Sequence, residues 1–247
     1  MTTALIAYLG ELIGTAILIL LGNGVVANVL LAKTKGHGSG LLVIAFAWAI
    51  AVFTGVFITA PLSGAHLNPA VTLGLAVAGK FSWGLVPGYV LAQLCGAGLG
   101  QVAVIWSYRD HYQATEDQGL ILATFSTDPA IPNTFSNLLT EAIGTFVLVF
   151  AVLYITGPKF GDSAGSLGAL DALPVALVVL GIGLSLGGPT GYAINPARDL
   201  APRIVHELYP LKHKGAGNWS YSWIPVAGPL LGALFAAGLW HLVPVAL

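Results

Sequence analysis

Ser63-Gly-Ala-His-Leu-Asn-Pro-Ala70 decides how this chain folds, because a close copy, Thr190-Gly-Tyr-Ala-Ile-Asn-Pro-Ala197, follows 127 positions later. Each copy ends on a sequence that starts a helix. Asn is a strong N-cap, and Pro suits the first helical position because the N–H that it lacks would have no partner there. We therefore predict two short helices, which start at Asn68, Pro69 and Ala70 and again at Asn195, Pro196 and Ala197.

A second motif repeats at nearly the same distance. Glu11-Leu-Ile-Gly-Thr15 returns as Glu141-Ala-Ile-Gly-Thr145, 130 positions later. Two unrelated motifs with almost equal offsets indicate an internal duplication. We predict a first repeat at residues 1–106 and a second at 138–247, joined by a connecting loop at 107–137.

The composition places the chain in a membrane. Hydrophobic residues make up 56% of it and charged residues 8%, whereas soluble domains carry roughly 25% charged residues. A helix needs roughly 20 mainly apolar residues to cross a bilayer, and six stretches meet or approach that length: 5–31, 41–62, 85–106, 138–156, 172–186 and 224–245. The helices expected at 68–79 and 195–206 are too short to cross.

Three spanning helices in each repeat force the second repeat to enter the membrane in the opposite orientation. Short or interrupted apolar segments at matching places of such repeats mark the transport site. The predicted fold is an all-α membrane protein with six transmembrane helices and two re-entrant half-helices in an inverted repeat. The two half-helix N-termini then meet near the midplane, where their partial positive charges repel cations and hydronium. We also expect the amide groups of Asn68 and Asn195 to be free to donate to a permeating hydroxyl.

Both motifs resemble those of the major intrinsic protein family of aquaporins and glycerol facilitators. The resemblance extends over the whole chain through residues 63–70 and Gly191-Tyr-Ala-Ile-Asn-Pro-Ala-Arg-Asp199. It implies an aquaporin-like fold, one pore per subunit, a homotetramer, and a multi-pass protein of the cell membrane with a cytoplasmic N-terminus. That orientation leaves more Lys and Arg outside than inside, against the positive-inside rule.

In this family a narrow constriction selects the solute. The resemblance assigns it to Trp48, Gly183, Tyr192 and Arg198, a set similar to that of glycerol facilitators. Gly183 is expected to widen the passage, the two rings to face the carbon side of a polyol, and the Arg198 fork to donate to its hydroxyls. The resemblance also implies a ladder of carbonyl acceptors from Gly64, Ala65 and His66 and from Gly191, Tyr192 and Ala193.

The implied function is a passive channel that excludes ions and protons and needs no cofactor. Its expected solutes are glycerol, dihydroxyacetone, urea, hydrogen peroxide, protonated lactic acid and water. One alternative is a water-selective aquaporin, although members of that kind usually carry His where this chain has Gly183. Another is an inverted-repeat secondary transporter, which usually needs more helices and a site for a coupling ion.

The positions of the other polar residues indicate structural roles. We expect Glu11 and Glu141 to accept hydrogen bonds from loop backbone N–H groups and so hold the half-helices, with a proton relay as the alternative. Asp199 is expected to pair with Arg203. His66 is expected to make a ring-to-backbone hydrogen bond, with gating by pH as the alternative. The sequence suggests no metal site, no nucleophile–base pair of an enzyme, and no basic patch for a nucleic acid.

Overall fold

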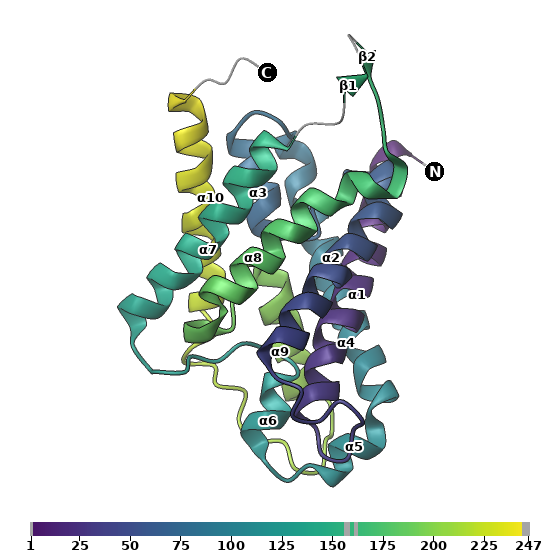
Figure 1. Cartoon of the computed structure of the whole chain (residues 1–247), viewed down its shortest axis with the longest axis vertical. Helices are drawn as coiled ribbons and strands as arrows, with labels where there is room; N and C mark the ends of the chain where they lie inside the picture. Colours follow the sequence, from purple (N-terminus) through teal and green to yellow (C-terminus); the bar gives the residue numbers. More distant parts are fainter. Residues whose placement is uncertain (1, 156–158, 161–162, 244–247) are drawn as a thin grey trace.

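Long apolar helices form the frame of the molecule (Figure 1). A computed structural model describes residues 2–155, 159–160 and 163–243. Six of its helices are long and apolar enough to cross a membrane, which confirms the predicted stretches; the predicted ends at 156 and 244–245 lie outside the described residues. The spanning helices are α1 (Thr3–Leu30), α2 (Leu41–Ser63), α4 (Val86–Ser107), α7 (Thr134–Tyr154), α8 (Leu173–Thr190) and α10 (Ile224–Leu242). The chain is a multi-pass membrane protein.

Two short helices, α3 (Pro69–Val77) and α9 (Pro196–Leu208), begin inside this frame. At 1.5 Å per residue, their 9 and 13 residues cannot cross a hydrocarbon core of about 30 Å. Both start as predicted. The Asn68 side-chain oxygen accepts from the Ala70 N–H at 2.8 Å, and the Asn195 oxygen accepts from the Ala197 N–H at 3.0 Å.

The N-termini of α3 and α9 meet in the middle of the bundle. Asn68 Nδ2 donates to the Ile194 carbonyl at 2.8 Å, and Asn195 Nδ2 donates to the Leu67 carbonyl at 2.8 Å. From this point α3 runs toward the face that holds both chain ends, and α9 runs toward the opposite face (Figure 1). The two half-helices thus point in opposite directions, as an inverted repeat requires.

The connecting loop contains structure that the sequence pattern did not predict. It folds into α5 (Arg109–Ala114) and α6 (Gln118–Ala123), and Asp117 caps α6 by accepting from the Leu120 N–H at 3.0 Å. Helices of 6 residues are too short to show an apolar period. Small elements elsewhere are the 3₁₀ turns η1 (Trp83–Leu85) and η2 (Gly168–Ala172) and the hairpin of β1 (Lys159–Phe160) and β2 (Ser163–Ala164).

Glycines bring the spanning helices into backbone contact. A Cβ added at Gly96 of α4 would lie 2.2 Å from the Leu12 carbonyl oxygen of α1, and one at Gly100 would lie 2.4 Å from that of Ala16. Gly232 of α10 is equally close to the Ala142 carbonyl oxygen of α7, at 2.2 Å. Small residues permit such close approach between membrane helices, so the same device joins α4 to α1 and α10 to α7.

The close contact at Gly96 predicts that alanine substitutions at two glycines of α4 have different effects on stability. Gly96→Ala should destabilise the protein by about 1–3 kcal/mol, because the new methyl group must push two backbones apart. Gly98→Ala is the matched control, since its Cβ would meet only Val205 Cγ2 at 3.8 Å. Thermal unfolding of both variants in the same detergent measures the difference. Equal melting temperatures would contradict close packing at Gly96.

Candidate functional site

A cavity of about 320 Å³ lies where the two half-helices meet. One wall is apolar and comes from the spanning helices. The other is formed by the segments 64–67 and 192–194, which lead into α3 and α9. The apolar wall includes Leu18, Val52, Val56, Leu148, Val152, Val175 and Val179.

The two segments share an unusual backbone. Ala65 and Leu67 have φ values of 51°, and Tyr192 and Ile194 have values of 40° and 43°. Left-handed conformations cost a residue with a side chain roughly 1–2 kcal/mol each. The strained positions recur 127 residues apart, so both segments hold the same shape and require the same support.

Glu11 supports the first segment. Its carboxylate accepts from the backbone N–H groups of His66 at 2.9 Å and Leu67 at 2.7 Å. It also accepts from Ser63 Oγ and Gln93 Nε2, each at 2.7 Å. A buried charge is tolerated only when it is fully hydrogen-bonded, and four donors meet that condition. The sequence analysis missed Gln93, although a glutamine within an apolar spanning helix is costly and signals such a contact.

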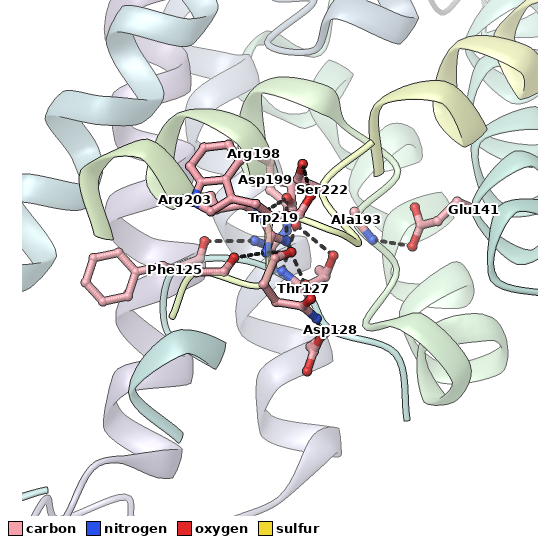
Figure 2. Close-up of polar contacts among 12 residues, drawn as sticks. Phe125, Thr127, Asp128, Glu141, Ala193, Arg198, Asp199, Arg203, Trp219 and Ser222 are labelled. Carbon is pink, nitrogen blue, oxygen red and sulfur yellow. Dashed lines mark hydrogen bonds and ion pairs between the residues drawn. The ribbon is translucent and has the colours of Figure 1, made fainter. Parts of the chain in front are cut away.

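Glu141 supports the second segment in the same way. It accepts from the backbone N–H of Ala193 at 2.9 Å (Figure 2). It also accepts from the backbone N–H of Ile194 at 2.8 Å and from Thr190 Oγ1 at 2.6 Å. Both carboxylates lie completely buried. Their contacts match the structural role rather than a proton relay, because each accepts from backbone donors that have no other acceptor within their own segment.

The expectation that both asparagine amides are free needs correction. One N–H of Asn68 and one of Asn195 are used to bind the carbonyl that precedes the opposite half-helix. A primary amide has two N–H donors, so one remains on each side chain for the cavity, which both residues line. The same groups therefore join the two segments and face the passage.

The structure brings Trp48, Gly183, Tyr192 and Arg198 close together, and all of them except Gly183 line the cavity. The Arg198 Cζ lies 4.5 Å from the centre of the Trp48 ring. A Cβ at Gly183 would lie 2.9 Å from Tyr192 Cζ, and one at Gly187 would lie 2.7 Å from its Cδ1. The expectation that Gly183 widens the passage directly is thus wrong. Gly183 and Gly187 leave space for the Tyr192 ring. This ring, and neither glycine, lines the cavity.

Arg198 keeps most of its donors unused. Among the described residues its side chain makes one hydrogen bond, from Nη1 to the Phe125 carbonyl at 3.4 Å (Figure 2). Asn23 Nδ2 donates to the same carbonyl at 2.9 Å. A guanidinium has five N–H donors, so several face the cavity that Arg198 lines. Nothing in the sequence of the connecting loop indicated that Phe125 reaches this site.

An ion pair holds α9 beside the connecting loop. Asp199 and Arg203 form an ion pair (Figure 2) at 2.8 Å, and both side chains are fully buried. Asp199 also accepts from the Thr127 N–H and hydroxyl, each at 2.7 Å, and Arg203 donates to the Thr127 carbonyl at 2.9 Å and the Gly217 carbonyl at 2.6 Å. These contacts fix the helix turn that carries Arg198.

His66 and Gly191 depart from the expected details. The His66 Nδ1 lies 3.1 Å from Thr72 Oγ1, and its ring packs against Phe81 and Tyr89 at centroid distances of 4.6 and 5.0 Å. The partner is therefore a side chain and not backbone. Gly191 ends α8 in a left-handed conformation with φ of 75° and is absent from the described cavity wall, whereas Gly64, Ala65, His66, Tyr192 and Ala193 line it.

Comparisons with known proteins agree over nearly the whole chain. The family model described as Major intrinsic protein matches residues 1–241. The chain is 53% identical to the "Glycerol uptake facilitator protein" of Streptococcus pneumoniae over 94% of this chain and 97% of that protein. It is 49% identical to the "Probable glycerol uptake facilitator protein" of Thermotoga maritima over 95% and 97%. The X-ray structure of the aquaglyceroporin from Plasmodium falciparum superposes with a TM-score of 0.83, at 30% identity over 97% and 96%.

The Glu11 contacts predict a specific loss. Glu11→Gln should lower the free energy of unfolding by about 1–3 kcal/mol, because an NH₂ group then faces donors and leaves at least one buried N–H without an acceptor. Glu116→Gln is the control, since it makes the same change at an exposed loop residue. Thermal unfolding of the purified variants measures the effect. A Glu11→Gln protein as stable as the control would show that the carboxylate does not support the segment.

Proposed function

The chain belongs to the major intrinsic protein family, and on this basis we propose that it is a passive channel for glycerol and other small uncharged solutes. Two relatives whose sequences are 53% and 49% identical to this chain are named glycerol uptake facilitators. The superposed structure is that of an aquaglyceroporin. Family membership also favours a channel over an enzyme.

One observation carries the choice of solute. Arg198, with most of its donors unused, lies across from the Trp48 ring at 4.5 Å, and the Tyr192 ring packs against Gly183 beside them. This constriction is polar on one side and aromatic on the other. A polyol has hydroxyl groups along one edge and C–H groups along the other, so it satisfies both sides at once. Water has no apolar edge and makes no use of the rings.

The rest of the passage continues the same pattern. A polyol that leaves Arg198 meets carbonyl acceptors of the two segments on one side and the valine and leucine wall on the other. At the centre, the remaining N–H groups of Asn68 and Asn195 donate to its hydroxyl oxygens. Exchange of one acceptor or donor for the next keeps the cost of dehydration low along the path.

Charge exclusion follows from the same centre. The N-termini of α3 and α9 meet there, and each carries roughly half a positive charge. Arg198 adds a full charge at the constriction. Cations and protons are therefore repelled, while dihydroxyacetone, urea, hydrogen peroxide, protonated lactic acid and water carry no charge and are small enough to be solutes.

We propose, from its family membership, that the channel lies in the cell membrane as a homotetramer.

Solute uptake by proteoliposomes tests this function. Stopped-flow light scattering with glycerol and each of the other solutes should show rapid glycerol entry, with an imposed proton gradient left intact. Rapid water entry with no glycerol entry would support the water-selective alternative instead. Proton current that accompanies glycerol entry would support a transporter.

The position of Tyr192 predicts the effect of a single methyl group. Gly183→Ala should push the Tyr192 ring toward the passage, because the new Cβ lies 2.9 Å from its Cζ. The lower end of the cost of overpacking, about 1 kcal/mol, corresponds to about fivefold in rate. The ratio of glycerol to water permeability should therefore fall at least about fivefold.

Gly181→Ala is the matched control on the same helix, because a Cβ there meets no atom within 4 Å. Both variants are compared with the wild type at equal protein density. An unchanged ratio in a folded Gly183→Ala channel would mean that the Tyr192 ring does not limit the passage of glycerol.

A further inference from the structure

A second cavity, of about 570 Å³, lies at the rim of the bundle, away from the passage. It sits on the membrane face where α5 lies, opposite the face that holds the chain ends (Figure 1). The end of α4, the helix α5 and the segment that follows α9 enclose it. Its walls are Ile105, Trp106, Arg109, Tyr112, Gln113, Tyr209, Pro210, Leu211 and Lys212.

The cavity opens beside a surface of α4 that faces away from the bundle. Leu91, Leu99 and Trp106 are 63%, 57% and 68% exposed, and Cys95 between them is exposed as well. Their spacing places them on one stripe of the helix, whereas Gly96 and Gly100 face α1. An exposed apolar stripe on a spanning helix meets lipid chains, and a tryptophan at its end marks the membrane interface.

The cavity has two positive charges and no negative one. Arg109 and Lys212 are both exposed, and among the described residues neither side chain makes an ion pair or a hydrogen bond. No carboxylate lines the cavity. Burial raises the pKa of Tyr112, whose hydroxyl is bonded to Thr124 Oγ1 at 2.6 Å, so this phenol stays neutral. The two cations are left for a ligand.

We propose that this cavity binds the phosphate of an anionic phospholipid, held by Arg109 and Lys212, while Trp106 packs against the upper part of an acyl chain. A lipid is favoured over a soluble phosphate because the cavity is continuous with the lipid-facing stripe. An anionic lipid is favoured over a zwitterionic one because no carboxylate lines the cavity to pair with a choline or an ethanolamine group.

Native mass spectrometry of the full chain in a neutral detergent tests the proposal. Phosphatidylglycerol should bind more tightly than phosphatidylcholine with identical acyl chains. The double variant Arg109→Gln, Lys212→Gln should weaken phosphatidylglycerol binding on the order of 30-fold, since each basic residue near a membrane surface contributes about fivefold. Unchanged glycerol uptake by this variant verifies its fold.

The double variant Lys33→Gln, Lys35→Gln is the matched control. It removes two charges from another exposed loop of the chain and should bind phosphatidylglycerol like the wild type. If both double variants bind phosphatidylglycerol equally weakly, the loss depends on the net charge of the protein and not on this cavity, and the proposed site is wrong. Displacement of the lipid by free glycerol 3-phosphate at an equal concentration would overturn the choice of a lipid. If the cavity variant fails to fold, 0.5 M salt on the wild type should release phosphatidylglycerol, and retention would overturn the proposal.

Discussion

Two buried carboxylates support the centre of this molecule. Glu11 and Glu141 each bind two consecutive backbone N–H groups of a segment that leads into a half-helix. Those segments contain left-handed residues with side chains, which are costly, and non-helical backbone is tolerated at membrane depth only when protein or a water-filled cavity satisfies it. The carboxylates supply acceptors for the backbone N–H groups of these segments, so the segments keep their shape without helical hydrogen bonds.

The two repeats share the buried carboxylate that binds the segment before the half-helix, but they differ in the charged residues at the start of the half-helix. Arg198 and Asp199 occupy the positions that Val71 and Thr72 hold in the first half, 127 residues earlier. Thr72 bonds to His66 and Gln93, which are neutral partners. In the second half Arg198 lines the cavity, and Asp199 and Arg203 form a fully buried ion pair. The second half therefore contributes a positive charge to the cavity wall at the position where the first half has Val71.

Much of the fold could be predicted because its signals are local. Asparagine followed by proline favours a helix start through contacts within the next few residues, and six apolar stretches indicate six spanning helices. The duplication indicated that the half-helices meet. Other contacts could not be predicted, because they join segments far apart in the chain. Phe125 and Thr127 reach Arg198 and Asp199 from a loop without a helical or strand pattern, and Gln93 reaches Glu11 across 82 positions.

By itself, the sequence determined the membrane class, the duplication and the two helix starts. Its resemblance to the family pointed to Trp48, Gly183, Tyr192 and Arg198, which lie close together in the structure. Only the tertiary structure decided how they are used. One N–H of each asparagine joins the two segments, and Gly183 accommodates the Tyr192 ring instead of leaving the passage open. The physical reason is that helix capping and hydropathy depend on neighbours in the chain. Which group accepts from a hydrogen-bond donor, or fills an empty volume, depends instead on which residues from distant parts of the chain pack against it.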